Sequence, residues 1–308
     1  MEVRLRARIA ALAEAEPALA DDLALRGALI EIVDRAETGP FELRLPADLV
    51  RARLAAGVPL LDRLDLPIPP STAALFERLT AAMLAAPDTR EPAEALLVAL
   101  RSHRLHAEQL VGEAIVGHDD HLAALAASAG IAEKLVILVA DLASRAVLAD
   151  VARRLRPALA LGAWDRAYCP MCGGLPILAE RSLPVEIASS PSPAHGGGGR
   201  GIGDILRCGR CATAWAHTLQ QCPDCTTGAF GVVHTEEGGW RLAACDACPA
   251  YLKISASPRA ERLGELLADD LETWSLDRWA LEHGLQRRGV PGYRLEHGEP
   301  PGEELDDD

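Results

Sequence analysis

Aromatic residues are scarce in this chain of 308 residues: Phe, Tyr and Trp make up 4% of it, whereas hydrophobic residues make up 49%. Alanine and leucine must therefore fill the core, and the length suggests two or three domains. Long apolar runs are missing too, since the longest clear one, residues 135–140, is far shorter than the ~18 residues that cross a bilayer. We expect no membrane insertion and, because no secretory signal is recognisable, a cytoplasmic protein.

A basic excess is also missing. The formal net charge is −14, and residues 165–259 hold equal numbers of acidic and basic side chains. A protein that binds nucleic acid usually presents a basic face, so we expect no nucleic-acid partner. The chain also shows no nucleophile with a recognisable base, no phosphate-binding loop and no dinucleotide fingerprint. We therefore do not expect an enzyme, and no catalytic residue is predicted.

What the chain does contain is eight cysteines, all between Tyr168 and Ile254 and all in C-x-x-C pairs. A C-x-x-C turn, or knuckle, presents two thiolates from one tight stretch of backbone, and two knuckles supply the four sulfurs of a tetrahedral metal centre. Four knuckles therefore predict two centres. The predicted ligands are Cys169, Cys172, Cys208, Cys211, Cys222, Cys225, Cys245 and Cys248.

The spacing of the knuckles favours pairing in chain order. The gap between Cys225 and Cys245 holds 19 residues, which is usual for a four-cysteine site. The gap between Cys172 and Cys208 holds 35, but it contains a Gly-, Ser- and Pro-rich run at 188–203 that is typical of a flexible insertion. We prefer the first knuckle with the second and the third with the fourth, while crossed or nested pairings stay open.

The cysteines have two other possible interpretations, disulfides and a redox pair. Disulfides are rare in a reducing cytosol. A thioredoxin-like redox pair belongs at the start of a helix within a βαβ unit, whereas the neighbours of these knuckles read as short hairpin strands. Rubredoxin-like or zinc-ribbon modules fit that context better, although four thiolates do not separate iron from zinc.

The rest of the chain is mostly helical in pattern. Apolar residues recur at helical spacing over residues 1–163, which we interpret as an α-helical domain of five to seven helices. His118 and His121 in this part fit a polar loop and helix start better than a metal site. The predicted fold is α+β, with an N-terminal all-α domain, two ribbons and a C-terminal helix. Its predicted parts are the helical domain 1–163, the ribbons 164–218 and 219–257, the C-terminal helix 258–290 and a disordered acidic tail 291–308.

Together the motifs resemble the formate dehydrogenase accessory protein family (FdhE type) over roughly residues 164–290. They are C-P-x-C-G from Cys169, I-L-R-C-x-x-C from Ile205 with Thr213 and Trp215 after it, C-P-x-C from Cys222, C-x-x-C-x-x-Y-L-K from Cys245, L-A-D-D-L from Leu267 and L-D at Leu276. The chain departs from the family in its long Gly-rich insertion, in Ala214 before the tryptophan and in its ending around Tyr293.

The resemblance implies a cytoplasmic maturation factor that binds the catalytic subunit of a respiratory formate dehydrogenase. It also implies that the eight cysteines hold two metal ions, iron by family resemblance or else zinc. Tyr251, Lys253, Asp269 and Asp270 fall on signature positions, and we predict them as partner-binding residues. The alternatives are a zinc-ribbon protein that binds another partner or nucleic acid, and a C-x-x-C thiol oxidoreductase.

Overall fold

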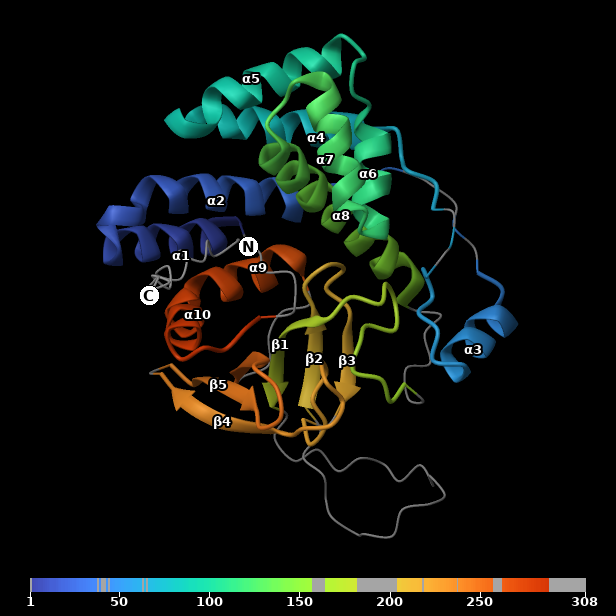
Figure 1. Ribbon diagram of the computed structural model, residues 1–308, viewed down its shortest axis with the longest axis vertical. Coiled ribbons are helices and arrows are strands. Elements are labelled where there is room, and N and C mark those ends of the chain that lie inside the picture. Colours follow the sequence, from blue (N-terminus) through green and yellow to red (C-terminus); the bar gives the residue numbers. More distant parts are fainter. Residues whose placement is uncertain are drawn as a thin grey trace, which may run out of the picture.

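The computed structural model describes residues 2–156, 164–181, 204–256 and 262–287, apart from residues 38, 40–42, 44, 63, 65, 218 and 237. The predicted tail 291–308 and the Gly-rich run 188–203 lie outside these residues. Helices come first, strands follow, and two further helices end the described chain (Figure 1). The predicted α+β class with its two four-cysteine regions is therefore confirmed.

Eight α-helices form the N-terminal body within the described residues, more than the five to seven predicted. They are α1 (Glu2–Ala15), α2 (Ala20–Asp34), α3 (Ala47–Ala55), α4 (Ser71–Ala82), α5 (Pro87–Arg101), α6 (Ala107–Val116), α7 (Asp119–Ala129) and α8 (Glu133–Leu155), with short 3-10 turns η1 (Pro17–Leu19) and η2 (Met83–Ala85). The number was wrong because the apolar period continues across breaks: the stretch from Pro92 to Val116 reads as one helix, yet His103 adopts a φ of 56° between α5 and α6.

Helix α8 is the centre of the body. It contacts α2, α4, α5, α6 and α7, and buried residues occur on all its sides rather than on one stripe. Such a helix is surrounded by other elements rather than lying at the surface. One of its buried residues is Arg145, whose side chain pairs with Asp141 at 2.8 Å. Among the described residues, no helix is both long and apolar enough to cross a membrane.

The two ribbons join into one six-stranded sheet with the order β3-β2-β1-β6-β5-β4. Its strands are β1 (Pro176–Arg181), β2 (Asp204–Cys208), β3 (Ala214–His217), β4 (Phe230–Thr235), β5 (Trp240–Cys245) and β6 (Tyr251–Ser255). Each ribbon is an antiparallel set, and the parallel pair β1–β6 connects them, with Leu178 opposite Lys253. The sheet therefore carries one pair of knuckles in each half.

The C-terminal helix is broken into α9 (Leu263–Glu272) and α10 (Trp274–Glu282) at Thr273, whose hydroxyl bonds to the carbonyl of Asp269. Helix α9 contacts α1 and α2, and α10 contacts β5, so the pair lies between the helical body and the sheet (Figure 1). Gly264 allows this approach, because a Cβ there would lie 2.5 Å from the Cβ of Asp34. The predicted division into separate domains stays a prediction.

Candidate metal centres

The sulfurs of the eight cysteines lie in two clusters, each formed by two knuckles. The first holds Cys169, Cys172, Cys208 and Cys211, the second holds Cys222, Cys225, Cys245 and Cys248, and within each cluster all sulfurs lie within 4.8 Å of one another. The knuckles thus pair in chain order, first with second and third with fourth. The crossed and nested alternatives are wrong.

All four knuckles share one backbone design. In each, the amide two residues after the first cysteine donates to that cysteine's sulfur at 3.3–3.4 Å, and the donors are Met171, Arg210, Asp224 and Ala247. In the first three, the residue after the second cysteine has a positive φ: 74° at Gly173, 57° at Ala212 and 60° at Thr226. These amide donors stabilise negative charge on sulfur, which a metal-binding thiolate requires.

The distances between sulfurs fit a tetrahedral ion. In the first cluster Cys169–Cys211, Cys172–Cys208 and Cys172–Cys211 are each 3.5 Å apart, and in the second Cys222–Cys248 is 3.8 Å and Cys225–Cys245 is 3.7 Å. Metal–sulfur bonds of about 2.3 Å in a tetrahedron place the sulfurs about 3.8 Å apart, whereas a disulfide needs about 2.05 Å. The two clusters can therefore hold two metal ions, and none of the eight cysteines is disulfide-bonded.

The first centre is built into the main core. Cys169, Cys208 and Cys211 are at most 2% exposed, and Cys172 packs against the same apolar cluster. Burial raises the pKa of the Cys169 thiol. Four thiolates cannot be held in such a place without a cation, because buried charge is costly unless it is compensated. The donor set thus fits a resident ion.

Both knuckles of the first centre are tied to the helical body. The amides of Leu60 and Leu61 donate to the carbonyls of Pro170 and Met171 at 2.9 and 2.8 Å. In the second knuckle, the Arg210 guanidinium donates to two carbonyls at the C-terminal end of α6, those of Ala114 and Ile115, both at 2.9 Å. Arg145 of α8 donates to the carbonyl of Gly209 at 3.2 Å. The centre therefore lies at the junction of helices and sheet.

The second centre forms a small separate cluster. Its buried members are Cys222, Cys245 and Ala250, while Cys225 and Cys248 are half-buried. The hydroxyl of Thr227 donates to the Cys225 sulfur at 3.3 Å. This bond, together with backbone hydrogen bonds from Gly228 and Thr227, lowers the pKa of that thiol to about 6. This centre lies at the β4–β5 half of the sheet.

The four signature residues predicted to bind a partner are all buried. Tyr251, Lys253, Asp269 and Asp270 are at most 4% exposed, and Asp269 pairs with Arg8 of α1 at 2.5 Å. Adjacent acidic residues on a helix usually form a solvated face, but Asp269 and Asp270 do not, since both carboxylates have cationic partners inside the protein. Their role in partner binding stays a prediction; in the structure they hold elements together.

Three of these residues belong to one buried charge network. Lys253 of β6 bonds to Asp270 at 2.6 Å and to Asp277 at 2.8 Å, Tyr251 donates to Asp277 at 2.8 Å, and Arg287 contacts both carboxylates. Two cations thus face two anions. We name this set, Tyr251, Lys253, Asp270, Asp277 and Arg287, the charge network. It joins β6 to α9 and α10.

The network shifts the pKa values of Asp270 and Tyr251. Burial raises the pKa of Asp270, but the charges of Arg287 and Lys253 outweigh burial, and the pKa falls to about 2. Burial, together with the charge of Asp277, raises the pKa of Tyr251 well above its usual range. Sequence reasoning missed Arg287, which lies beyond every motif, and no spacing pattern pointed to it.

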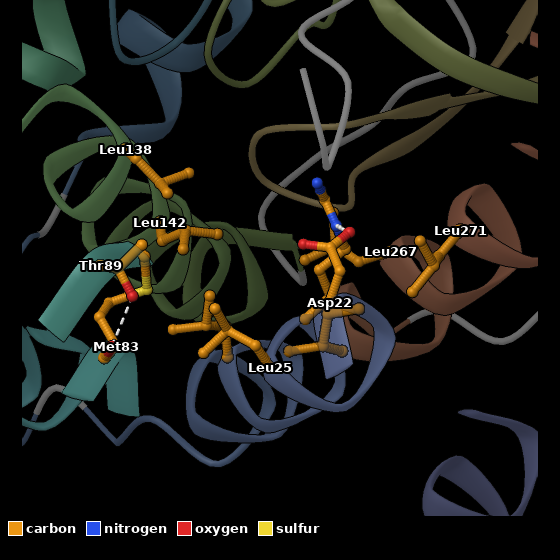
Figure 2. Close-up of a pocket in the computed structure, with 11 residues that line it drawn as sticks. Asp22, Leu25, Met83, Thr89, Leu138, Leu142, Leu267 and Leu271 are labelled. Atoms are coloured by element: carbon orange, nitrogen blue, oxygen red, sulfur yellow. Dashed lines mark hydrogen bonds and ion pairs between the residues drawn. The ribbon is translucent and has the colours of Figure 1, made fainter. Parts of the chain in front are cut away.

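A pocket of about 180 Å³ lies away from both centres, between α2, α8, α9 and the η2–α5 turn. Leu25, Leu138, Leu142, Leu267 and Leu271 contribute to its lining (Figure 2). Its polar groups are engaged, because Asp22 pairs with Arg26 at 2.6 Å and the Thr89 hydroxyl donates to the carbonyl of Met83. It offers apolar surface and no catalytic group.

Among the described residues, His118 and His121 belong to neither of the two groups that could hold a metal ion. Both imidazoles contact Glu113, at 2.9 and 3.0 Å, and both are largely exposed. The preference for a polar loop and helix start agrees with their position, since His118 precedes α7 and Asp119 begins it.

No model of a protein family matches the chain. Curated proteins named Protein FdhE from two Escherichia coli strains, O127:H6 and K12, are 27% and 26% identical to it over 129 residues, which is 41% of this chain and 37% of each relative. The crystal structure of the FdhE protein from Pseudomonas aeruginosa superimposes with a TM-score of 0.60 over 94% of both chains, at 21% identity. The resemblance predicted from the motifs is therefore confirmed: in sequence over two fifths of its length, and in fold over nearly all of it, this chain is similar to the FdhE proteins.

Proposed function

We propose that this protein is a cytoplasmic accessory factor that binds the catalytic subunit of a respiratory formate dehydrogenase and helps to form active enzyme. It is not itself an enzyme. The observation that carries the proposal is the closure of all eight cysteines into two four-sulfur sets within an FdhE-like fold. The identity of the client comes from the family resemblance. It is part of the proposal because the match covers only 37% of the length of the curated relatives.

Each four-cysteine set holds one ion in this proposal. The first is held by Cys169, Cys172, Cys208 and Cys211, and the second by Cys222, Cys225, Cys245 and Cys248. Bound iron supplies a one-electron couple and bound zinc supplies none, so the metal decides whether a centre is redox-active. Family resemblance favours iron. Metal analysis with an absorption spectrum tests this: colourless protein with stoichiometric zinc after expression in iron-replete cells defeats the iron version.

The geometry disfavours the thiol oxidoreductase alternative. A redox C-x-x-C needs two sulfurs free to form a disulfide with each other, whereas here every pair contributes both sulfurs to a four-sulfur cluster. Such an enzyme predicts turnover in an insulin or glutathione assay that survives metal removal. We expect none.

Affinity capture from the native cell tests the client. The full chain with a C-terminal tag is captured under reducing conditions, beside a control that expresses the tag alone, and co-purifying proteins are identified by mass spectrometry. We expect the large subunit of a formate dehydrogenase to be recovered only with the chain. Recovery of a different enzyme in its place, or of none in repeated captures, contradicts the proposal.

A further inference from the structure

The two centres differ in the exposure of the residues between their cysteines. In the first centre Pro170, Met171 and Gly209 are buried, and Arg210 is half-buried. In the second centre Pro223 and Asp224 are half-buried, while Asp246 and Ala247 are exposed. The second pair of knuckles is therefore more open to an approaching molecule than the first, which has a single half-buried cysteine, Cys172.

The centres also differ in what holds their loops. The first is bonded to the helical body through Leu60, Leu61, Arg145 and Arg210, as described above. Hydrogen bonds of the second centre run within its own loops and to the segment after α10. Asp246 accepts from the amide of Ala229 at 2.9 Å, Gln221 donates to the carbonyl of Thr226 at 3.0 Å, and the Gln286 amide donates to the carbonyl of Pro249 at 2.7 Å. Opening the second centre therefore disturbs little beyond itself.

Two half-buried cysteines, against one in the first centre, give the second centre a route for ligand exchange. Cys225 and Cys248 are its two half-buried ligands, and they come from different knuckles. An external thiol can approach the ion beside either one. With an ion held by the four cysteines, the sulfur of the incoming thiol would replace that of Cys225 as a ligand, and the proton of that thiol would pass to the released Cys225 thiolate. Four sulfur ligands would remain, and no electron would be transferred.

We propose that the second centre is an exchange site, at which a thiophilic metal ion is taken up from, or passed to, a thiol-bearing molecule, while the first centre keeps its ion as long as the protein is folded. Loss of the second ion disrupts only the small local cluster whose buried members are Cys222, Cys245 and Ala250. Loss of the first opens the main core, where Cys169, Cys208 and Cys211 are packed. Local openings of low free energy exchange faster than openings of the whole fold. This proposal does not depend on the identity of the client.

Metal release to a coloured chelator tests the proposal on the full chain. The protein is reconstituted with two zinc ions and mixed with excess 4-(2-pyridylazo)resorcinol, and absorbance reports the zinc released. We expect one ion in a fast phase and the second slower by roughly tenfold or more, because its release requires a larger opening of the fold. Release of both ions in a single phase overturns the proposal.

The fast phase is assigned by alkylation of the wild type, which needs no variant to fold. Iodoacetamide is added after the fast phase, and the modified cysteines are located by peptide mapping. We expect labels on Cys222, Cys225, Cys245 and Cys248 and protection of the other four. Labels on Cys169, Cys172, Cys208 or Cys211 at that stage contradict the assignment.

A matched pair of variants gives the same answer independently. Cys225 and Cys172 are each the half-buried second cysteine of a knuckle, one in each centre. We expect Cys225→Ser to release one zinc ion, in the slow phase, and to show no fast phase. We expect Cys172→Ser to retain the fast phase of zinc release. The reverse pattern refutes the proposal.

Discussion

The sheet is fastened to helices in two chemically different ways. On the β1–β2 side, the first centre's knuckles attach to α6, α8 and the segment around Leu60. On the β6 side, the charge network attaches the sheet to α9 and α10 without any external component. The first attachment depends on a bound metal ion. The second needs none, because the two cations of the charge network balance its two anions. Removing metal should therefore loosen one attachment and spare the other.

The charge network is specific rather than simply stabilising. Lys253, Asp270 and Asp277 are fully buried, so their attraction is offset by the cost of removing them from water. Deleting one partner leaves an uncompensated buried charge, which is much more costly than replacing a whole pair with apolar groups. Any other packing of α9 and α10 on the sheet would leave buried charges unpaired and is therefore unfavourable.

The largest expected effect is at the first centre. Cys208→Ser removes a fully buried ligand, and structural zinc sites supply on the order of 10 kcal/mol to folding. We expect loss of the cooperative thermal transition followed by circular dichroism. Cys225→Ser is the control and should keep a cooperative transition. Equal effects of the two changes would remove the distinction between the centres.

Next in size is the charge network. Asp270→Asn leaves Lys253 and Arg287 facing Asp277 alone, and we expect a loss of about 3–5 kcal/mol in the free energy of unfolding, measured in urea. The double change Lys253→Met with Asp270→Leu removes a cation and an anion together. It should cost less than the sum of the two single changes, and strict additivity would show that the pair is not coupled.

Tyr251→Phe should have a smaller effect that depends on pH. At neutral pH the lost bond to Asp277 costs about 1–2 kcal/mol. Because the folded-state pKa of Tyr251 is raised, the wild type keeps this phenol protonated and holds its full stability below about pH 10. Above that pH the unfolded chain loses the proton first, and the wild type should lose about 1.4 kcal/mol per pH unit relative to Tyr251→Phe. A difference between them that is constant from pH 8 to 11 would contradict the raised pKa.

The smallest expected effect is that of Arg210→Ala. It removes the two bonds from the second knuckle to the C-terminal end of α6, where a cation is favourable, and we expect a loss of about 1 kcal/mol. The same change should speed zinc release from the first centre and leave the second unchanged. An unchanged slow phase would show that this tether does not hold the centre closed.

The two four-cysteine centres could be predicted from the sequence, because a C-x-x-C turn is local and its chemistry needs no knowledge of distant residues. The 19-residue gap between Cys225 and Cys245 even indicated the pairing that the structure has. The parallel pairing of β1 with β6, which makes one sheet of two ribbons, was not predictable. It joins residues far apart in the chain and leaves no local pattern.

The charge network could not be predicted from the sequence. Asp269 and Asp270 look like a solvated face of a helix, because the sequence does not show that Arg8, Lys253 and Arg287 surround them in the fold. The helix count failed for a related reason, since the turn at His103 interrupts a continuous apolar period without any proline or glycine. The helical period of these residues can be recognised from the sequence, but their partners in the fold cannot.

The most direct test of the two-centre account is the metal content of the folded full chain, measured by mass spectrometry beside the double variant Cys225→Ser and Cys248→Ser. The account predicts two ions per wild-type chain and one per variant chain, with X-ray absorption showing four sulfur ligands at about 2.3 Å in both. A wild type that binds a single ion, or a variant that loses both, would contradict it.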